Sequence, residues 1–108
     1  MKEILRGMVV SPGVASGPAV VVREPNDLKR FKEGDVLIAK CTDPSFTVIF
    51  WKAAAVVTEV GGTASHAAII AREMGIPCIV GACRATEIIQ DGLQLKVDAI
   101  QGVVYATD

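Results

Sequence analysis

A helix with clear start and stop signals lies between two short apolar runs, and this pattern restricts the fold more than any other part of the sequence. The helix is predicted over residues 65–74, because Gly75 stands where a left-handed C-cap belongs and Pro77 lies just beyond it. The runs at 54–58 and 78–80 are too apolar for half-exposed strands, so each predicts a buried strand. A strand, a helix and a second strand in succession indicate an α/β fold.

A second helix–strand unit precedes the first. Asp43 is a favourable N-cap, and Pro44 suits the first helical position, where its missing N–H costs nothing. An apolar stripe at helical spacing follows, formed by Phe46, Ile49, Phe50 and Ala53. Residues 36–39 predict a short buried strand, and residues 26–31 a short helix before it. The middle of the chain therefore alternates helices and strands.

The two ends of the chain are predicted to be strands. Residues 7–10 and 15–22 flank a turn, and Gly17-Pro18 suggests a bend or a sheet edge, since proline cannot donate to a ladder. The C-terminal part predicts a hairpin of residues 93–97 and 103–106. Strands, two helix–strand units and a hairpin together predict an α/β mixed-sheet sandwich with short helices, not a regular βαβ ladder.

Length and charge narrow the function classes. The chain has 108 residues, which fits a single domain over 1–108. Its net charge of −1 and pI near 5.8 give no electrostatic basis for binding nucleic acid or an anionic membrane. Charged residues or glycines interrupt the longest apolar stretches and no signal peptide opens the sequence, so we expect no membrane segment. Three cysteines without a disulfide-like spacing favour a reducing, cytoplasmic location.

The only histidine, His66, lies in the first turn of the predicted helix. The first N–H groups of a helix lack intrahelical partners, and the helix dipole is positive there. This field favours a neutral imidazole with an available lone pair, and it would stabilise a phosphoryl group on the ring. Gly61 and Gly62, just upstream, leave room for a bulky donor. A lone histidine here can also be a cap or a packing residue, and the two glycines an ordinary turn.

The periodicity of this helix predicts which side chains are buried. One face gathers the predicted core residues Ala67, Ile70, Ala71 and Met74. Ala68 and Arg72 are expected to point away from that face. His66 falls on the flank, where its neighbours would fix it while it stays reachable from outside.

The sequence gives little support for a metal site or for a serine nucleophile. Cys78 and Cys83 could join His66 around a metal ion, but Cys78 belongs to a predicted buried strand, so we expect no metal site. Ser65 and His66 do not form a nucleophile–base pair, because adjacent helical residues diverge by about 100°. The sequence around Ser65 also lacks a Gly-x-Ser-x-Gly elbow.

The segment around His66 resembles the phosphohistidine signature of the phosphoenolpyruvate-utilising enzymes, and among these it is most similar to phosphoenolpyruvate synthases. The matching string is Gly61-Gly62, then Ser65-His66-Ala67-Ala68-Ile69-Ile70-Ala71-Arg72-Glu73, then Gly75-Ile76-Pro77 and Gly81. Further similarity covers Ser11-Pro12-Gly13, Ala15-Ser16-Gly17 and Thr42-Asp43-Pro44. The resemblance therefore extends over nearly the whole chain.

The resemblance implies a swivelling β/β/α domain in which His66 is the phosphorylated residue. Gly61, Gly62 and Ser65 match the surrounding motif and are expected to provide phosphate binding and access. Arg72 and Glu73 match the helix and are expected to form structural ion pairs or docking contacts. Ala64 replaces a threonine found in many relatives, so a hydroxyl that serves regulation there is missing.

The resemblance also implies partners. A carrier of this kind works with a nucleotide-binding domain and a barrel that binds phosphoenolpyruvate or pyruvate, here expected in trans, with Mg²⁺ on those partner domains and no cofactor in this chain. The chain would then be part of a phosphotransferase and not a complete catalyst alone. A different function stays open, that of a stand-alone binding or regulatory module with the same fold and no phosphotransfer.

Overall fold

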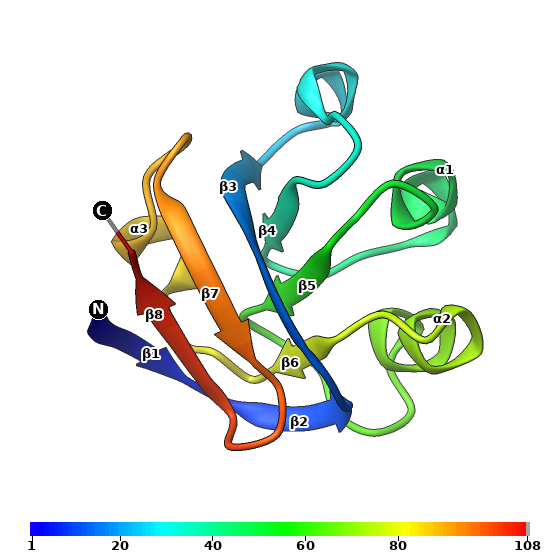
Figure 1. The fold of residues 1–108 in the computed structure, drawn as a ribbon. Coiled ribbons are helices and arrows are strands. Elements are labelled where there is room, and N and C mark those ends of the chain that lie inside the picture. The colour runs from blue at the N-terminus through cyan, green and yellow to red at the C-terminus, as the bar shows by residue number, and fades with distance from the viewer. Residues whose placement is uncertain (108) are drawn as a thin grey trace.

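The computed structural model describes residues 1–107, in which short helices connect the strands of one mixed sheet (Figure 1). The elements in chain order are β1 Lys2–Arg6, β2 Met8–Ser11, β3 Val14–Val22, the 3₁₀ helix η1 Pro25–Arg30, β4 Val36–Ala39, the 3₁₀ turn η2 Pro44–Phe46, α1 Thr47–Phe50, β5 Ala55–Thr58, α2 His66–Met74, β6 Cys78–Val80, α3 Ala85–Ile88, β7 Gln94–Asp98 and β8 Val103–Ala106.

The predicted elements are present, and the start and stop signals lie where expected. Ser65 caps α2, and Gly75 ends it in the left-handed conformation with φ of 69°. The helix after Asp43 is shorter than its apolar stripe suggests, because it ends at Phe50 and Ala53 lies beyond it. The edge strand β1 and the short helix α3 were not predicted from the sequence. In β1 only Leu5 is buried, so its residues carry little hydrophobic signal.

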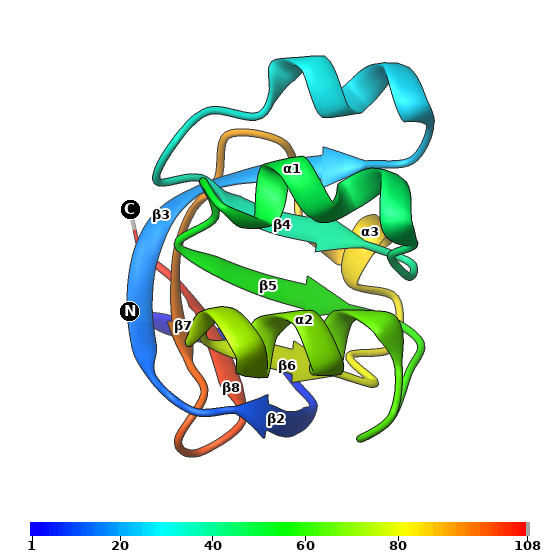
Figure 2. The ribbon, with the colours of Figure 1, turned by 90° about the vertical axis from the view of Figure 1, so that its right-hand side faces the viewer.

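The strands follow the order β1-β8-β7-β3-β4-β5-β6-β2. The central strands β3, β4, β5 and β6 run parallel, joined in turn by η1, by η2 with α1, and by α2. This centre is more regular than predicted, whereas the antiparallel strands on both sides make the sheet mixed. The parallel arrangement brings the carboxyl ends of β3, β4 and β5 to one edge (Figure 2).

Side chains on the two faces of the parallel strands enter two different cores. Val36 and Ile38 of β4 belong to the cluster that contains Leu95 of β7. Leu37, between them, belongs to the cluster that contains Phe50 of α1. Because successive strand residues point to opposite faces, one strand supplies both cores. The result is three layers, one of β1, β7 and β8, one of the parallel strands, and one of η1, α1 and α2, which confirms the predicted β/β/α sandwich. The short helix α3 lies on the other side, where Ala85 joins the core of the antiparallel strands.

Strand β3 takes part in both β layers. Its residues 14–18 pair with β7, and its residues 19–22 pair with β4. The change of partner falls at Gly17 and Pro18, where the sequence suggested a bend. At Gly17 a Cβ atom would lie 2.2 Å from the carbonyl oxygen of Gly34, so only glycine fits there.

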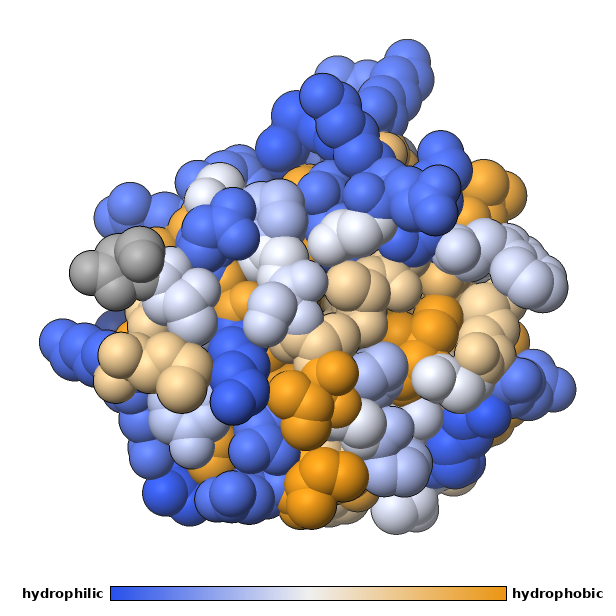
Figure 3. Space-filling model, viewed as in Figure 1, coloured by the Kyte–Doolittle hydropathy of each residue, from blue (hydrophilic) through white to orange (hydrophobic). Residues whose placement is uncertain are grey.

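The surface is polar over much of the face shown in Figure 1. Hydrophilic side chains cover its upper part, and exposed apolar side chains gather in its lower middle (Figure 3). Large apolar side chains that are more than half exposed include Val14, Val48, Trp51 and Ile100. Within residues 1–107 no helix is both long and apolar enough to cross a membrane.

We predict that Gly17→Ala destabilises the domain by about 2 kcal/mol or more, because the new methyl group meets the backbone oxygen of Gly34, which cannot move without displacing the turn that leads into β4. Gly62→Ala is the matched control, since a Cβ at Gly62 meets nothing within 4 Å. Urea unfolding should therefore give a lower free energy of unfolding for Gly17→Ala and a nearly unchanged one for Gly62→Ala. Equal values for the two variants would contradict the close approach of Gly17 and Gly34.

Candidate functional site

His66 is the first residue of α2, at the edge where the parallel strands end. The preceding residue, Ser65, is the N-cap, and its hydroxyl oxygen accepts a hydrogen bond of 3.4 Å from the N–H of Ala68. The same hydroxyl donates to the carbonyl of Gly62 at 2.9 Å. Ser65 is thus occupied with closing the turn that leads into the helix, a role that N-cap serines often have.

The imidazole of His66 is held by two residues from the segment after β4. The hydroxyl of Thr42 lies 2.8 Å from Nδ1 of His66, within hydrogen-bonding distance. The ring of Phe50 stands at 90° to the imidazole, with 6.0 Å between the ring centroids. These contacts fix the ring plane, while the residue remains half-buried. Nε2 has no hydrogen-bond partner among residues 1–107, so it is the ring nitrogen open to chemistry.

The loop before α2 and the first turn of the helix present several unused donors. Within the described chain, no acceptor is bonded to the N–H groups of Thr63, Ala64, His66 and Ala67. The first N–H groups of a helix are unpaired by geometry, and here the Ser65 cap satisfies only that of Ala68. Free N–H groups and the positive end of the helix dipole favour an anion at this place.

The two glycines before the loop differ from each other. Gly61 has a φ of 136°, and a Cβ there would approach Oγ of Ser65 to 3.0 Å. Its role is therefore conformational. Gly62 has ordinary backbone geometry, and a side chain at this position would extend into open space. Any effect of a larger residue at Gly62 would come from blocking that space.

The structure corrects two expectations about α2. Ala68 is fully buried beside Ala67 and Ala71, so it belongs to the core face and does not point away from it. The short alanine side chains let α2 lie close to the sheet, which widens the buried face. Arg72 forms no ion pair with a carboxylate among residues 1–107, and its guanidinium instead donates to the carbonyl groups of Thr63 and Val10.

A carboxylate accompanies the imidazole. Asp43 caps η2, and its Oδ1 accepts hydrogen bonds from the hydroxyl and the N–H of Ser45. These two bonds lower the pKa of the Asp43 carboxyl, and a positive charge on the His66 ring, when it is protonated, lowers it further. The site therefore keeps an anionic group beside the ring, on the same segment as Thr42.

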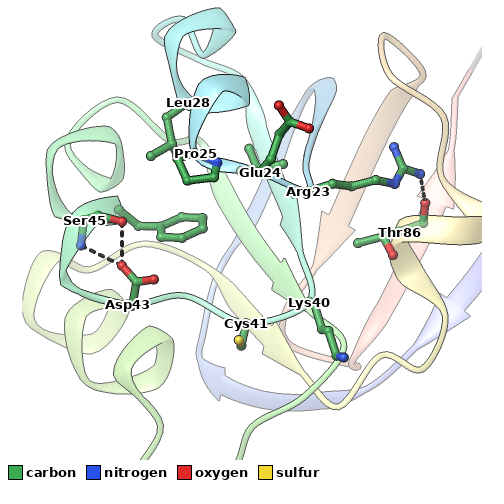
Figure 4. A pocket seen from close by; sticks show the side chains of 11 residues that line it. Arg23, Glu24, Pro25, Leu28, Lys40, Cys41, Asp43, Ser45 and Thr86 are labelled. Carbon is green, nitrogen blue, oxygen red and sulfur yellow. Dashed lines mark hydrogen bonds between the residues drawn. The ribbon is translucent and has the colours of Figure 1, made fainter.

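A cavity of about 380 Å³ lies beside the segment that carries Thr42 (Figure 4). It is lined by Val22, Arg23, Glu24, Pro25, Leu28, Lys40, Cys41, Asp43, Ser45, Phe46 and Thr86. Figure 4 shows Arg23 directed to Thr86 and Asp43 bonded to Ser45. Because Cys41 and Asp43 line the cavity and Thr42 contacts His66, one short segment joins the two features.

The cysteines do not assemble around the histidine. Cys78 is fully buried in β6, and burial raises the pKa of its thiol to about 12. Cys41 and Cys83 are exposed. In the part of the chain that the structure describes, no group of three histidine, cysteine, aspartate or glutamate side chains could hold a metal ion.

The geometry thus brings together His66, Ser65 and the two glycines, which the sequence had singled out. Thr42 and Phe50 were not predicted to contact the ring. Thr42 lies 24 residues before His66, and no spacing rule connects a residue after one strand with a helix start after the next. The resemblance covered Thr42-Asp43-Pro44, but it gave no reason to place them at the histidine.

Comparisons with known proteins find a matching family, sequence relatives and solved structures with a similar fold. Residues 31–102 match the family model of the mobile domain of PEP-utilising enzymes. The chain is 47% identical to the probable phosphoenolpyruvate synthase of Staphylothermus marinus over 106 residues, which are 96% of this chain and 13% of that protein. It is 43% identical to the phosphoenolpyruvate synthase of Pyrococcus furiosus over 102 residues, 94% of this chain and 12% of that protein.

Among solved structures, the chain is similar to an NMR structure of Enzyme I (nEIt), with a TM-score of 0.74 and 16% sequence identity. The match covers 96% of this chain and 93% of that chain, and it concerns the fold alone. The chain spans about one eighth of the length of the curated relatives named above.

We predict that Thr42→Val changes the state of the His66 ring without unfolding the domain. The variant keeps the shape of the side chain but removes the partner of Nδ1, at a cost of about 0.5–1.5 kcal/mol in stability. Long-range ¹H–¹⁵N correlation spectra should show shifted ring nitrogens and an altered tautomer ratio. Thr47→Val is the control, because the hydroxyl of Thr47 has no hydrogen-bond partner among residues 1–107. Unchanged ring signals in Thr42→Val would refute the contact.

Proposed function

Because the chain belongs to the family of mobile domains of PEP-utilising enzymes, we propose that it is a phosphocarrier domain in which His66 takes up a phosphoryl group and passes it on. The observation that carries the proposal is the state of the imidazole. Thr42 occupies Nδ1, while Nε2 is open at the start of α2, beside N–H groups that have no acceptor in residues 1–107. The donor and the acceptor sites belong to partner domains in this proposal.

The hydrogen bond at Nδ1 supports Nε2 as the reacting atom in this proposal. When Nδ1 carries the ring proton, it donates to the oxygen of Thr42 and leaves the lone pair on Nε2. Nε2 then attacks the phosphorus of the donor, an N–P bond forms, and the bond from phosphorus to the leaving oxygen breaks with its electron pair going to that oxygen. The ring becomes a phosphoimidazolium whose Nδ1–H still donates to Thr42. Transfer to an acceptor oxygen reverses these changes.

The start of α2 favours the phosphorylated state. Helix N-termini stabilise an anion by about 0.3–1 kcal/mol at exposed sites and by up to about 2 kcal/mol in partly buried ones. Tenfold in rate requires about 1.4 kcal/mol, so this field alone supplies little of the acceleration that phosphoryl transfer needs. Cations that clamp the donor, with Mg²⁺ bridging its oxygens, would come from a nucleotide-binding domain and from a phosphoenolpyruvate- or pyruvate-binding barrel.

The length of the relatives supports this division of labour. This chain covers 13% and 12% of two phosphoenolpyruvate synthases, so most of each relative lies outside the matched part. The proposed substrates and partners of the chain are therefore those of a larger phosphotransferase. The bulk of the catalytic machinery would then lie in the parts of such proteins that this chain does not contain.

We predict that the purified chain keeps its mass when mixed with ATP and Mg²⁺ alone. Adding a phosphoenolpyruvate synthase that lacks its own carrier histidine should add one phosphoryl group, which acid removes and alkali does not, as expected for an N–P bond. Intact-mass spectrometry measures both results, and His66→Ala is the control that should take up none. Binding of the partner without uptake would favour a regulatory module, and self-phosphorylation by the chain alone would overturn the carrier proposal.

We predict that Gly62→Val slows phosphoryl transfer at least about tenfold, because a branched side chain would occupy the open space before His66 at a cost of about 1.4 kcal/mol or more in the barrier. Its thermal midpoint should stay close to that of the unmodified chain, since the site has room for the side chain. Single-turnover transfer and thermal unfolding are the measurements. Gly92→Val is the control, because Gly92 has equally open surroundings but a φ of 84°. This variant should show the opposite pattern, lower stability with normal transfer. A wild-type rate for Gly62→Val would refute the approach path.

A further inference from the structure

Arg72 connects the loop before His66 to the sheet. The residue lies in the last turn of α2, is exposed, and extends its side chain back along the helix. Its Nη2 donates to the carbonyl oxygen of Thr63 at 2.6 Å, and its Nη1 donates to the carbonyl oxygen of Val10 at 3.3 Å. One guanidinium therefore bridges two segments that are 53 positions apart in the sequence.

The loop has few other attachments. Within residues 1–107, Gly62 bonds only to Ser65, in the turn that leads into α2, and Ala64 has no hydrogen bond. The bond from Arg72 is the only hydrogen bond of Thr63 in the same range. The loop conformation between Gly62 and Ser65 thus depends on a side chain that starts nine residues after Thr63.

The other end of the bridge is rigid. Val10 is a buried residue of β2, which pairs with β6. Ser11, the next residue, donates from its hydroxyl to the carbonyl of Ala71 at 3.4 Å, so the end of α2 is itself held against β2. Arg72 consequently starts from a fixed helix, contacts a fixed strand and reaches a loop that is otherwise free.

We propose that Arg72 is a positioning residue, which holds residues 62–64 in the conformation that keeps the approach to Nε2 of His66 open to the donor site of a partner domain. This inference rests on the proposed carrier function. Arg72 acts through the loop and does not touch the imidazole. The planar guanidinium can serve two carbonyls at once, whereas the single nitrogen of lysine cannot hold the same fork geometry.

The test compares Arg72→Gln and Arg72→Lys with the control variant Arg6→Gln. Arg6 is an exposed arginine that pairs with Glu3, and it lies far from this loop in the sequence. Three quantities are measured on the full chain. These are amide hydrogen exchange at Ser65 and Ala68, whose N–H groups are hydrogen-bonded in the turn that leads into α2, loading of His66 by phosphoramidate, and transfer from a phosphoenolpyruvate synthase that lacks its carrier histidine. Phosphoramidate is a small donor that needs no partner, so it reports on the imidazole alone.

We expect faster exchange at the amides of Ser65 and Ala68 in Arg72→Gln, with exchange in β5 unchanged. Transfer from the partner should fall by about tenfold, as expected for one lost charge-assisted hydrogen bond, while phosphoramidate loading stays at the wild-type rate. Arg72→Lys should lie between Arg72→Gln and the unmodified chain, and Arg6→Gln should match the unmodified chain.

The outcomes separate this inference from the carrier function. Failure of phosphoramidate and partner alike to label His66 in the unmodified chain would remove the carrier function. Normal transfer in Arg72→Gln, or slower transfer without faster loop exchange, would overturn the positioning role while the carrier function stands. If Arg72→Gln does not fold, Arg72→Lys decides the question by the same two measurements.

Discussion

Where β3 passes from one layer of the sheet into the other, the carbonyl oxygen of Gly34 lies 2.2 Å from the point that a Cβ of Gly17 would occupy. The bend of β3 at this close approach lets one strand pair with β7 along its first half and with β4 along its second half. Both cores depend on it, because the outer antiparallel layer covers one face of the parallel strands only when β3 bends. Helices α1 and α2 then cover the other face.

The same arrangement places the histidine. Strands β3 to β6 run parallel, so the segments after β4 and β5 emerge at one edge, and these segments bring Thr42 and the start of α2 together. Carboxyl ends of parallel strands are the usual place for ligand sites in α/β folds, since helix N-termini and loops meet there. In this domain the edge supplies a fixed imidazole and several free N–H groups, but no group of side chains suited to hold a metal ion among residues 1–107.

The electrostatics of the site suit the proposed carrier role, in which a phosphoryl group must be both gained and lost. The N–H groups at the start of α2 offer a moderate field, worth about 2 kcal/mol at most for a partly buried anion. A stronger cation cluster would bind a phosphoryl group too tightly for a carrier to release. Asp43, whose carboxyl pKa is lowered chiefly by hydrogen bonds from Ser45, keeps negative charge nearby and limits the attraction further.

The sequence by itself determined the local elements and the residue that we propose to react, His66. Capping at Ser65 and Gly75, the bend at Gly17-Pro18 and the apolar runs depend on backbone chemistry within a few residues, so they could be predicted, as could the place of His66 at a helix start. The tertiary structure alone decided that Thr42 faces Nδ1, that Ala68 is buried, and that Arg72 reaches Thr63 and Val10. Those contacts join segments brought together by strand order and layer packing, and no periodicity in the chain encodes which side chains meet across such distances.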